Sequence, residues 1–251
     1  MKESKYYTGK LDLKCDVRLL LVHPISPRDG HEGPFHLPAY VYLLTTTSVD
    51  EIFCAGAPRS IEGPADSEKV MPFIVEKVRW AESQGYNAVI INCMLDPGLT
   101  EAKRVVAIPV IGLREANRAI ASLVGKNPAH IYPQNIPVLE LSSDEDRTVR
   151  ELVKIGQTEI NDNNADVLIL NCGYLGGLAQ RLQMKLGVPV LANLDVALRL
   201  AELLAIFDIR PKLRQPKALE GLNTSQATKD ANTSQKRGIA SLVRSLVKRY
   251  F

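Results

Sequence analysis

The sequence predicts an α/β fold with two pseudo-symmetric lobes, each a short parallel sheet flanked by helices, and a cleft between the lobes. Two observations support this prediction. An apolar strand followed by Asn-Cys occurs twice, at Ala88–Cys93 and at Val167–Cys172. Apolar segments of strand length also alternate with helical patterns, which is typical of doubly wound parallel sheets. Two copies of one structural unit therefore predict two similar lobes.

The repeat extends beyond the two cysteines. Three further matches have the same separation in sequence as the two cysteines, or one residue more. They are Gly98-Leu99 with Gly177-Leu178, Ile108-Pro109-Val110 with Val188-Pro189-Val190, and Glu115 with Asp195. Each copy thus reads as strand, cysteine, loop, helix, proline, strand, acidic residue and helix. Glu115 and Asp195 each start a predicted helix, where the helix dipole favours an acidic side chain, so capping is the expected role of both.

In the first copy, the apolar run Val17–Val22 predicts a buried parallel strand that ends at His23-Pro24. Glu51–Ala55 is a second expected strand. Ser67–Gln84 has apolar residues at helical spacing, and the glycine that follows ends this helix. The strand that ends at Cys93 comes next.

A helix is expected directly after Cys93. Asp96 is a suitable N-cap residue and Pro97 a suitable first helical residue, which places Cys93 beside a helix amino terminus. A strand is then expected at Ile108–Gly112, followed by a helix from about Glu115 to Val124. The second copy predicts, in order, a helix at Ser143–Asn161, a strand at Asp166–Asn171, a helix near Gly177–Leu186, a strand at Val188–Ala192 and a helix at Asp195–Phe207.

Four expected regions follow from this order of elements. Residues 1–112 with 193–210 form the first lobe, 113–192 the second lobe, 211–237 a flexible linker and 238–251 a basic amphipathic helix. The linker is low in large apolar residues and contains Asn-Thr-Ser-Gln twice. The last segment has apolar residues at i, i+3, i+4, i+7 and i+8.

Charge is distributed unevenly along the chain. The net charge is +3, yet residues 211–251 carry nine Lys/Arg and two Asp/Glu, whereas residues 1–210 carry 22 and 26. The basic helix is expected to dock on this chain itself, on a partner or on an anionic surface, and no motif indicates nucleic acid. The other expected partners are a small-molecule substrate and further copies of the chain in a homo-oligomer.

The apolar run Leu19–Val22 is too short for a membrane span or a signal-peptide core, so a cytoplasmic protein is expected. The four cysteines, Cys15, Cys54, Cys93 and Cys172, are widely spaced and form no CxxC pair. Reduced thiols are therefore expected, with neither a disulfide framework nor a structural zinc site.

The duplicated cysteines point to acid–base chemistry. A carbon next to a carbonyl group can be inverted without a cofactor by a base on one face and an acid on the other. Cys93 and Cys172 follow strands of parallel sheets, at the edge where such sheets bind ligands. A helix amino terminus lowers a thiol pKa, so one cysteine of a pair can be thiolate while the other is protonated. For Cys15 and Cys54 a buried, inert thiol is the expected role.

Several neighbours are candidate substrate-binding residues. The backbone amides of Met94, Leu95, Gly173 and Tyr174 are expected to bind a carboxylate or a developing enolate. Each strand-end asparagine is either a substrate contact or a turn residue. These two are Asn92 and Asn171, and His23 is a further candidate that ends the first strand. His31 and His36 lie in a Gly/Pro-rich loop and are expected at the surface, and the histidines show no metal-binding spacing.

These segments resemble the Asp/Glu/hydantoin racemase family, most closely its hydantoin and allantoin racemase branch. The resemblance covers about Val17 to Phe207 and rests on Pro58–Gly63, Cys93–Leu99, Ile108–Gly112, Val188-Pro189-Val190 and the helix Asp195–Leu204. It implies two α/β lobes, no cofactor, and a cysteine pair that acts as the two acid/bases, here Cys93 and Cys172. It adds Ser60, from the first of these segments, to the substrate-binding residues.

The chain departs from that family at two places within the lobes. The first strand is followed by His23-Pro24-Ile25 where the hydantoin branch tends to have Asn-Pro-Asn, so an apolar contact replaces a polar one. Residues 124–130 pass almost directly to Ile136-Pro137-Val138, so a strand that the family has in this interval is expected to be missing, and with it a wall of the pocket.

Three functions remain open from the sequence. The first is a racemase or epimerase of a hydantoin-like or amino-acid-derived substrate. The second is a decarboxylase or a cis-trans isomerase of the same superfamily. The third is a non-catalytic ligand-binding or scaffold relative, which the shortened second lobe and Ile25 favour. Fast alkylation of two thiols near neutral pH would favour catalysis, whereas four inert thiols would favour the scaffold.

Overall fold

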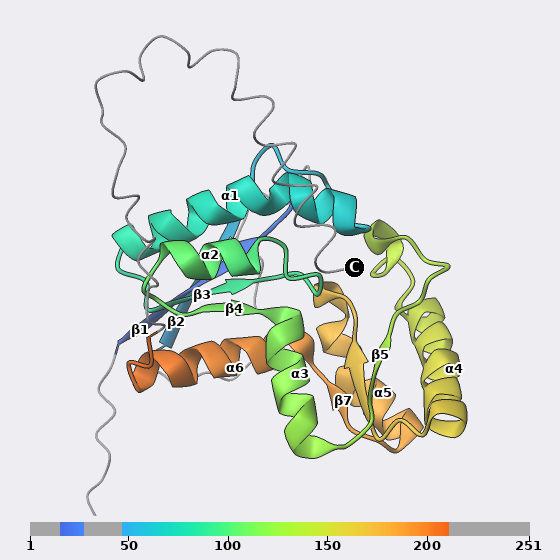
Figure 1. Cartoon of the computed structure of the whole chain (residues 1–251). Coiled ribbons are helices and arrows are strands. Elements are labelled where there is room, and N and C mark those ends of the chain that lie inside the picture. Colours follow the sequence, from blue (N-terminus) through green and yellow to red (C-terminus); the bar gives the residue numbers. More distant parts are fainter. Residues whose placement is uncertain (1–15, 28–46, 211–251) are drawn as a thin grey trace, which may run out of the picture. The chain divides into compact units, whose positions relative to one another are not determined.

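The computed structural model describes residues 16–27 and 47–210, which belong to one compact unit, and it confirms the predicted fold class (Figure 1). Two parallel sheets are present in these residues. The first has the order β2 (Thr47–Phe53), β1 (Val17–His23), β3 (Ala88–Ile91), β4 (Val110–Gly112), and the second the order β5 (Pro128–Ile131), β6 (Val167–Leu170), β7 (Val190–Leu191).

Helices flank both sheets, as expected for alternating strands and helices. They are α1 (Pro64–Ser83), α2 (Leu99–Val105), α3 (Leu113–Val124), α4 (Glu145–Asn163), α5 (Ala179–Leu186) and α6 (Asn193–Ile206), with 3-10 turns η1 (Val138–Glu140) and η2 (Gly173–Leu178). Helices α3 and α6 pack against each other, and α6 also packs on β1, β3 and β4. None of the helices in the described ranges is long and apolar enough to cross a membrane.

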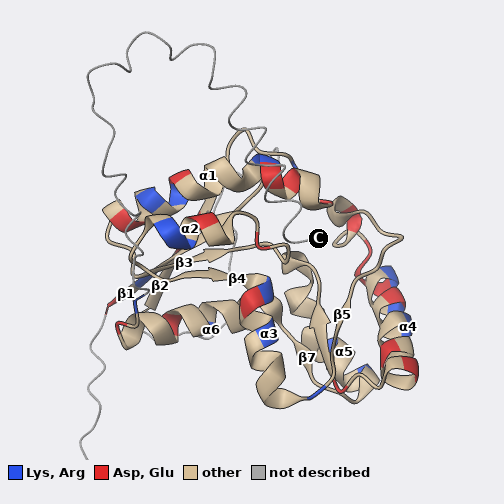
Figure 2. Ribbon diagram, viewed as in Figure 1, with Lys and Arg blue, Asp and Glu red and all other residues tan. Residues whose placement is uncertain are grey.

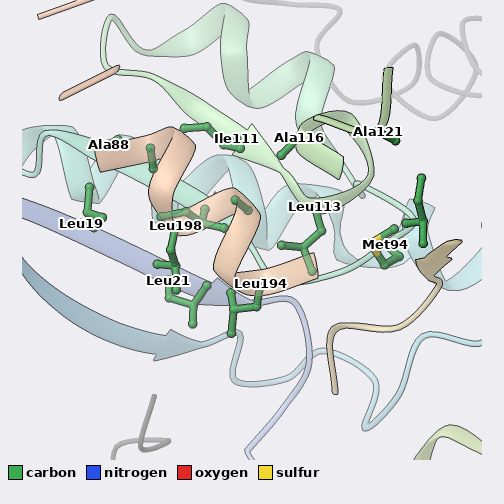
Figure 3. Packing of buried hydrophobic residues seen from close by; sticks show 14 of the residues in the cluster. Leu19, Leu21, Ala88, Met94, Ile111, Leu113, Ala116, Ala121, Leu194 and Leu198 are labelled. Carbon is green, nitrogen blue, oxygen red and sulfur yellow. The ribbon is translucent and has the colours of Figure 1, made fainter. Parts of the chain in front are cut away.

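The core consists of three clusters, two of which lie on opposite faces of the first sheet because side chains alternate between the two faces along a strand. Leu19 and Leu21 of β1 face one cluster with α6, whereas Leu20 and Val22 face a second cluster with α1 and α2. The α6 cluster includes Leu194 and Leu198 together with Leu113 of α3 (Figure 3), and it extends to Val167 and Ile169 of β6. The third cluster lies between the second sheet and helices α4 and α5. The α6 cluster therefore joins the two sheets.

Equivalent backbone hydrogen bonds show the internal repeat. The N–H of Asn92 donates to the carbonyl of Val22 at the end of β1, and the N–H of Asn171 donates to that of Ile131 at the end of β5, both at 2.9 Å. In the strand order, β1-β3-β4 therefore corresponds to β5-β6-β7, and among the described residues β2 has no counterpart in the second sheet.

The sequence misses strand β5 and overestimates the gap in the second lobe. Residues Pro128–Ile131 pair with Val167–Leu170 in parallel, so the strand that we expected to be missing is present. It is four residues long, and Pro128 and His130 on one of its faces are exposed, so no apolar pattern marks it.

The helix after Cys93 begins later than predicted. Helix α2 starts at Leu99 with Gly98 as its N-cap, and Gly98 has a left-handed φ of 63° that favours glycine. Asp96 and Pro97 lie before the helix, so the prediction that they cap it is wrong. Glu115 and Asp195 do lie in the first turns of α3 and α6.

Several expectations fall outside the described residues. These are Cys15, His31, His36, the linker 211–237 and the basic helix 238–251. The division of the chain into domains at the predicted residues stays a prediction, and so do the oligomeric state and the partners of the last segment.

Candidate active site

One cavity of about 170 Å³ brings the predicted site residues together. All ten of them line it: His23, Ser60, Asn92, Cys93, Met94, Leu95, Asn171, Cys172, Gly173 and Tyr174. They come from the ends of β1, β3 and β6 and from the segment that follows β2. The cavity is therefore formed by the carboxyl edges of two different sheets, because parallel strands bring their carboxyl ends to one edge of each sheet.

The two cysteines reach this cavity from equivalent positions. Cys93 lies two residues after β3 and Cys172 two residues after β6. Both are free thiols, Cys172 buried and Cys93 half-buried. The charge of Cys172 acts electrostatically on Cys93, so the two thiols are near enough for their ionisation to be coupled.

The pKa of Cys93 is raised to about 12, mainly by burial and to a smaller extent by charges on Cys172 and Asp96. The N–H of Leu95 donates to Sγ of Cys93 at 3.5 Å and, with Arg114, acts in the opposite direction. The expectation that a helix amino terminus lowers this pKa is wrong, because α2 starts six residues after Cys93 and desolvation dominates.

Two contacts with α3 hold the loop that carries Cys93. The carboxylate of Asp96 accepts hydrogen bonds from the N–H groups of Arg114 (3.0 Å) and Glu115 (2.9 Å), so it caps α3. Arg114 Nε donates to the carbonyl of Met94 at 2.6 Å. A Cβ added at Gly112 would lie 2.5 Å from the Asp96 carboxylate oxygens, so glycine is needed there for this close approach.

We expect Asp96→Asn to change how stability depends on pH. Burial raises the pKa of Asp96 to about 6 from its ordinary value of 3.8. A carboxyl with a raised pKa stabilises the fold fully below the unfolded value, and that contribution is lost as pH rises through about 6. The free energy of unfolding of the wild type should therefore fall by about 3 kcal/mol, relative to the variant, between pH 3.8 and 7.

Urea denaturation of both proteins across this pH range measures the difference. Exposed carboxyls with lowered pKa values, such as Asp66 and Asp166, are present in both proteins, so their contributions to the pH dependence cancel in the comparison. Parallel pH profiles for the two proteins would contradict the prediction.

Buried asparagines hold the loop that carries Cys172. Asn193, the first residue of α6, donates through Nδ2 to the carbonyl of Cys172 and, at 3.1 Å, to that of Leu170. Asn117 of α3 donates through Nδ2 to the carbonyl of Asn193 at 2.9 Å. Both side chains are fully buried. Helices α3 and α6 thus position both cysteine loops.

His23 is a buried positioning residue at one wall of the cavity. The amide Nδ2 of Asn92 donates to His23 Nδ1 at 3.2 Å, so Nε2 carries the ring proton and donates to Glu51 at 2.8 Å. The ring also stacks on Phe53 at a centroid distance of 4.4 Å. Oδ1 of Asn92 is buried without a hydrogen-bond partner among the described residues. Glu51 and His23 therefore fix the orientation of the Asn92 amide.

Further polar residues that the sequence did not single out line the cavity: Arg59, Glu62 and Tyr132. Arg59 and Glu62 lie in the same segment as Ser60, so the selection of Ser60 from the sequence could also have indicated these two residues. Tyr132 directly follows β5, and burial raises its pKa to about 12, with Cys172 the next cause. Tyr132 and Val138 form the wall that we expected to be missing, and Ile25 lines the cavity as an apolar contact.

No cluster of three or more His, Cys, Asp or Glu side chains that could hold a metal ion is found within residues 16–27 and 47–210. His130 lies on β5, outside this cavity. Cys54, by contrast with the pair, is fully buried in the core beside α1, as expected for an inert thiol.

Comparison with known proteins identifies several similar chains. Residues 43–131 match the sequence family described as Asp/Glu/Hydantoin racemase. The chain is 30% identical to a hydantoin racemase of Rhizobium meliloti over 173 residues, 59% of this chain and 72% of that protein. Its fold is similar to the allantoin racemase of Pseudomonas fluorescens (TM-score 0.73, 20% identity, 82% of this chain and 100% of the other). It is also similar to that of Klebsiella pneumoniae (TM-score 0.68, 21% identity, 82% and 96%).

Proposed function

The chain belongs to the Asp/Glu/hydantoin racemase family, and we propose that it is a cofactor-independent racemase or epimerase. Its substrate is a hydantoin-like or amino-acid-derived compound with a stereocentre next to a carbonyl group. Cys93 and Cys172 are the two acid/bases. The names of the similar proteins, hydantoin racemase and allantoin racemase, support this class of reaction.

The observation that carries the proposal is the meeting of Cys93 and Cys172 in one cavity. They come from two different sheets, at positions related by the internal repeat. An inert thiol has no reason to recur at the equivalent place in both lobes and to face the same small cavity. Inversion of a carbon requires an acid and a base on opposite faces, and this arrangement supplies one from each lobe.

In the proposed reaction, the thiolate of one cysteine takes the proton from the stereocentre, and the C–H electron pair moves into the carbonyl group to give an enolate. The thiol of the other cysteine then donates its proton to the opposite face. One thiol and one thiolate remain, exchanged between the two residues, so no co-reactant is consumed. Repulsion between two thiolates in a buried site favours the state in which one of them is protonated.

The backbone and polar side chains around the thiols provide the binding groups of the proposal. The loops after β3 and β6 bring the backbone of Met94 and Gly173 to the cavity, where N–H groups stabilise a developing enolate. Arg59 supplies a positive charge for a carboxylate or a ring carbonyl. Asn92 Oδ1 accepts an N–H group of the substrate, because a buried acceptor without a partner costs about 1–3 kcal/mol.

Proton exchange at the stereocentre tests the proposal directly. Single enantiomers of 5-monosubstituted hydantoins, allantoin and free amino acids are incubated with the protein in D2O. We expect at least one of them to lose optical rotation and to take up deuterium at the stereocentre, above the rate without protein. Release of CO2 from a substituted malonate, without such exchange, would instead assign a decarboxylase. No reaction with any of these compounds would contradict the proposal.

We expect the racemisation rate to rise with pH for the enantiomer whose stereocentre proton is removed by Cys93. Because burial raises the pKa of Cys93 to about 12, its thiolate fraction grows tenfold per pH unit below that value. The logarithm of kcat/KM should therefore rise with a slope approaching one between pH 7 and pH 9. Initial rates for each enantiomer, with circular dichroism to confirm folding at every pH, measure this slope. A plateau that starts near pH 7 would show that the thiolate is already formed at neutral pH.

A further inference from the structure

A second hollow, of about 930 Å³, lies beside the candidate active site. Its lining residues come from α3, from the turn that follows α3, from β5, and from β6 and its end. Figure 1 shows where α3 and β5 lie in the fold. Its polar lining includes Arg114 and Arg118 of α3, Lys126 of the turn and His130 of β5. Asn171 lines both this hollow and the active-site cavity.

The lining of this hollow is positively charged. It contains three Lys/Arg residues, and no aspartate or glutamate is among its described lining residues. Figure 2 shows basic stretches, in blue, on α3 and in the turn before β5. Residues 1–210 as a whole carry more acidic than basic residues, so the hollow differs in sign from the protein around it. A concave surface lined by one sign of charge concentrates its electric field.

Among the described residues, these cations also lack the direct ion pairs with carboxylates that several other surface cations form. Lys103 pairs with Glu115, Arg181 with Asp146 and Arg199 with Asp195. Within residues 16–27 and 47–210, Arg114, Arg118 and Lys126 form no direct ion pair, although the charge of Arg114 acts on Asp96 and that of Lys126 on Asp166. Asp166, which directly precedes β6, uses its carboxylate to accept hydrogen bonds from the backbone N–H groups of Lys126 and Asn127, each at 2.8 Å.

The fields of the two arginines overlap at His130. Burial is the main cause that lowers the pKa of His130, and the positive charges of Arg114 and Arg118 lower it further. Arg114 and Arg118 are four residues apart and therefore lie on the same face of α3. Two guanidinium groups on one face of α3, the lysine of the turn that follows α3 and the imidazole of His130 are suitable donors for several anionic oxygens.

We propose that this hollow is a binding site for an anionic small molecule that carries a diphosphate or several carboxylates. The three cations that line the hollow without a direct ion pair determine the charge of the ligand, and the volume of the hollow admits a molecule larger than a single phosphate. The site is separate from the proposed catalytic one, although Arg114 links them, because its Nε donates to the carbonyl of Met94 in the active-site cavity.

Titration of the full chain with pyrophosphate and with citrate, at constant ionic strength, tests this site. We expect saturable binding by calorimetry and a raised Tm for at least one of the two anions. Arg118→Gln and Lys126→Gln should each weaken that binding about tenfold, as expected for the loss of a charge-assisted hydrogen bond. Both residues are exposed, so the variants should fold normally.

Two matched variants make the outcome specific. Arg79→Gln removes the same charge from an exposed position of α1 outside the hollow, and it should leave binding unchanged. Arg59→Gln removes the cation of the active-site cavity and should also leave it unchanged. The proposal is overturned if neither anion binds saturably, if Arg79→Gln weakens binding as much as Arg118→Gln, or if Arg59→Gln alone abolishes it. None of these readouts depends on racemase activity.

Discussion

Cys93→Ser and Cys172→Ser are each expected to lower the rate of racemisation by at least about 10³-fold, because general acid–base catalysis contributes roughly 10²–10⁴-fold and a serine hydroxyl is a far weaker acid than a thiol. The two variants should differ in what they retain. Each keeps one thiol, which can still remove and return a proton on its own face of the substrate. Each variant should therefore exchange the stereocentre proton of one enantiomer only, and the two variants should act on opposite enantiomers.

Separate NMR assays of each enantiomer in D2O measure this exchange, and polarimetry measures racemisation. Cys54→Ser is the matched control, because Cys54 is a buried thiol of the first lobe that does not line the cavity. Its racemisation rate per folded molecule should equal that of the wild type, even if its stability falls. If either active-site variant racemised at the wild-type rate, the two-cysteine mechanism would be wrong.

Much of the fold was predictable because its central strands are buried on both faces. Segments such as Leu19–Val22 and Val167–Leu170 are continuous apolar runs, and the repeat of Asn-Cys after two of the strands indicated the equivalence of the lobes. The same repeat predicted which residues would meet, since parallel strands bring their carboxyl ends to one edge. The sheet edge is where prediction failed. Strand β5 is short, begins with proline and exposes one face, so hydrophobic pattern alone cannot reveal it.

The contacts that position the site were not predictable from local sequence. Asp96 looks like the cap of the helix next to it, yet its partners are the N–H groups of Arg114 and Glu115, eighteen and nineteen residues away. The chain reverses in the left-handed region at Asp96 (φ 48°) and Gly98, which delays α2 and turns the carboxylate toward α3. Likewise the pKa of Cys93 depends on burial by distant segments. Local rules predicted a lowered pKa, whereas the folded structure raises it.

The two cysteine loops touch each other, and this contact gives the second large expected effect. A Cβ added at Gly173 would lie 2.5 Å from Oδ1 of Asn92 and 3.4 Å from Leu113. Gly173 follows Cys172 and Asn92 precedes Cys93, so a side chain at position 173 must push the two loops apart or displace the Asn92 amide. Displacement of reacting groups by about 1 Å can cost 10²-fold in rate. We therefore expect Gly173→Ala to lower kcat by about 10²-fold while the protein stays folded.

Steady-state kinetics and urea denaturation of Gly173→Ala separate this effect from simple unfolding. Gly63→Ala is the control, because a Cβ there meets no atom within 4 Å, and its kcat should match that of the wild type. Any loss of stability in Gly173→Ala should shrink when Asn92→Ala is combined with it, since the amide that the new methyl group contacts is then gone. A kcat for Gly173→Ala within twofold of the wild-type value would show that the two cysteine loops do not constrain each other, and that the spacing of the thiols is set instead by Asn193 and Asp96 alone.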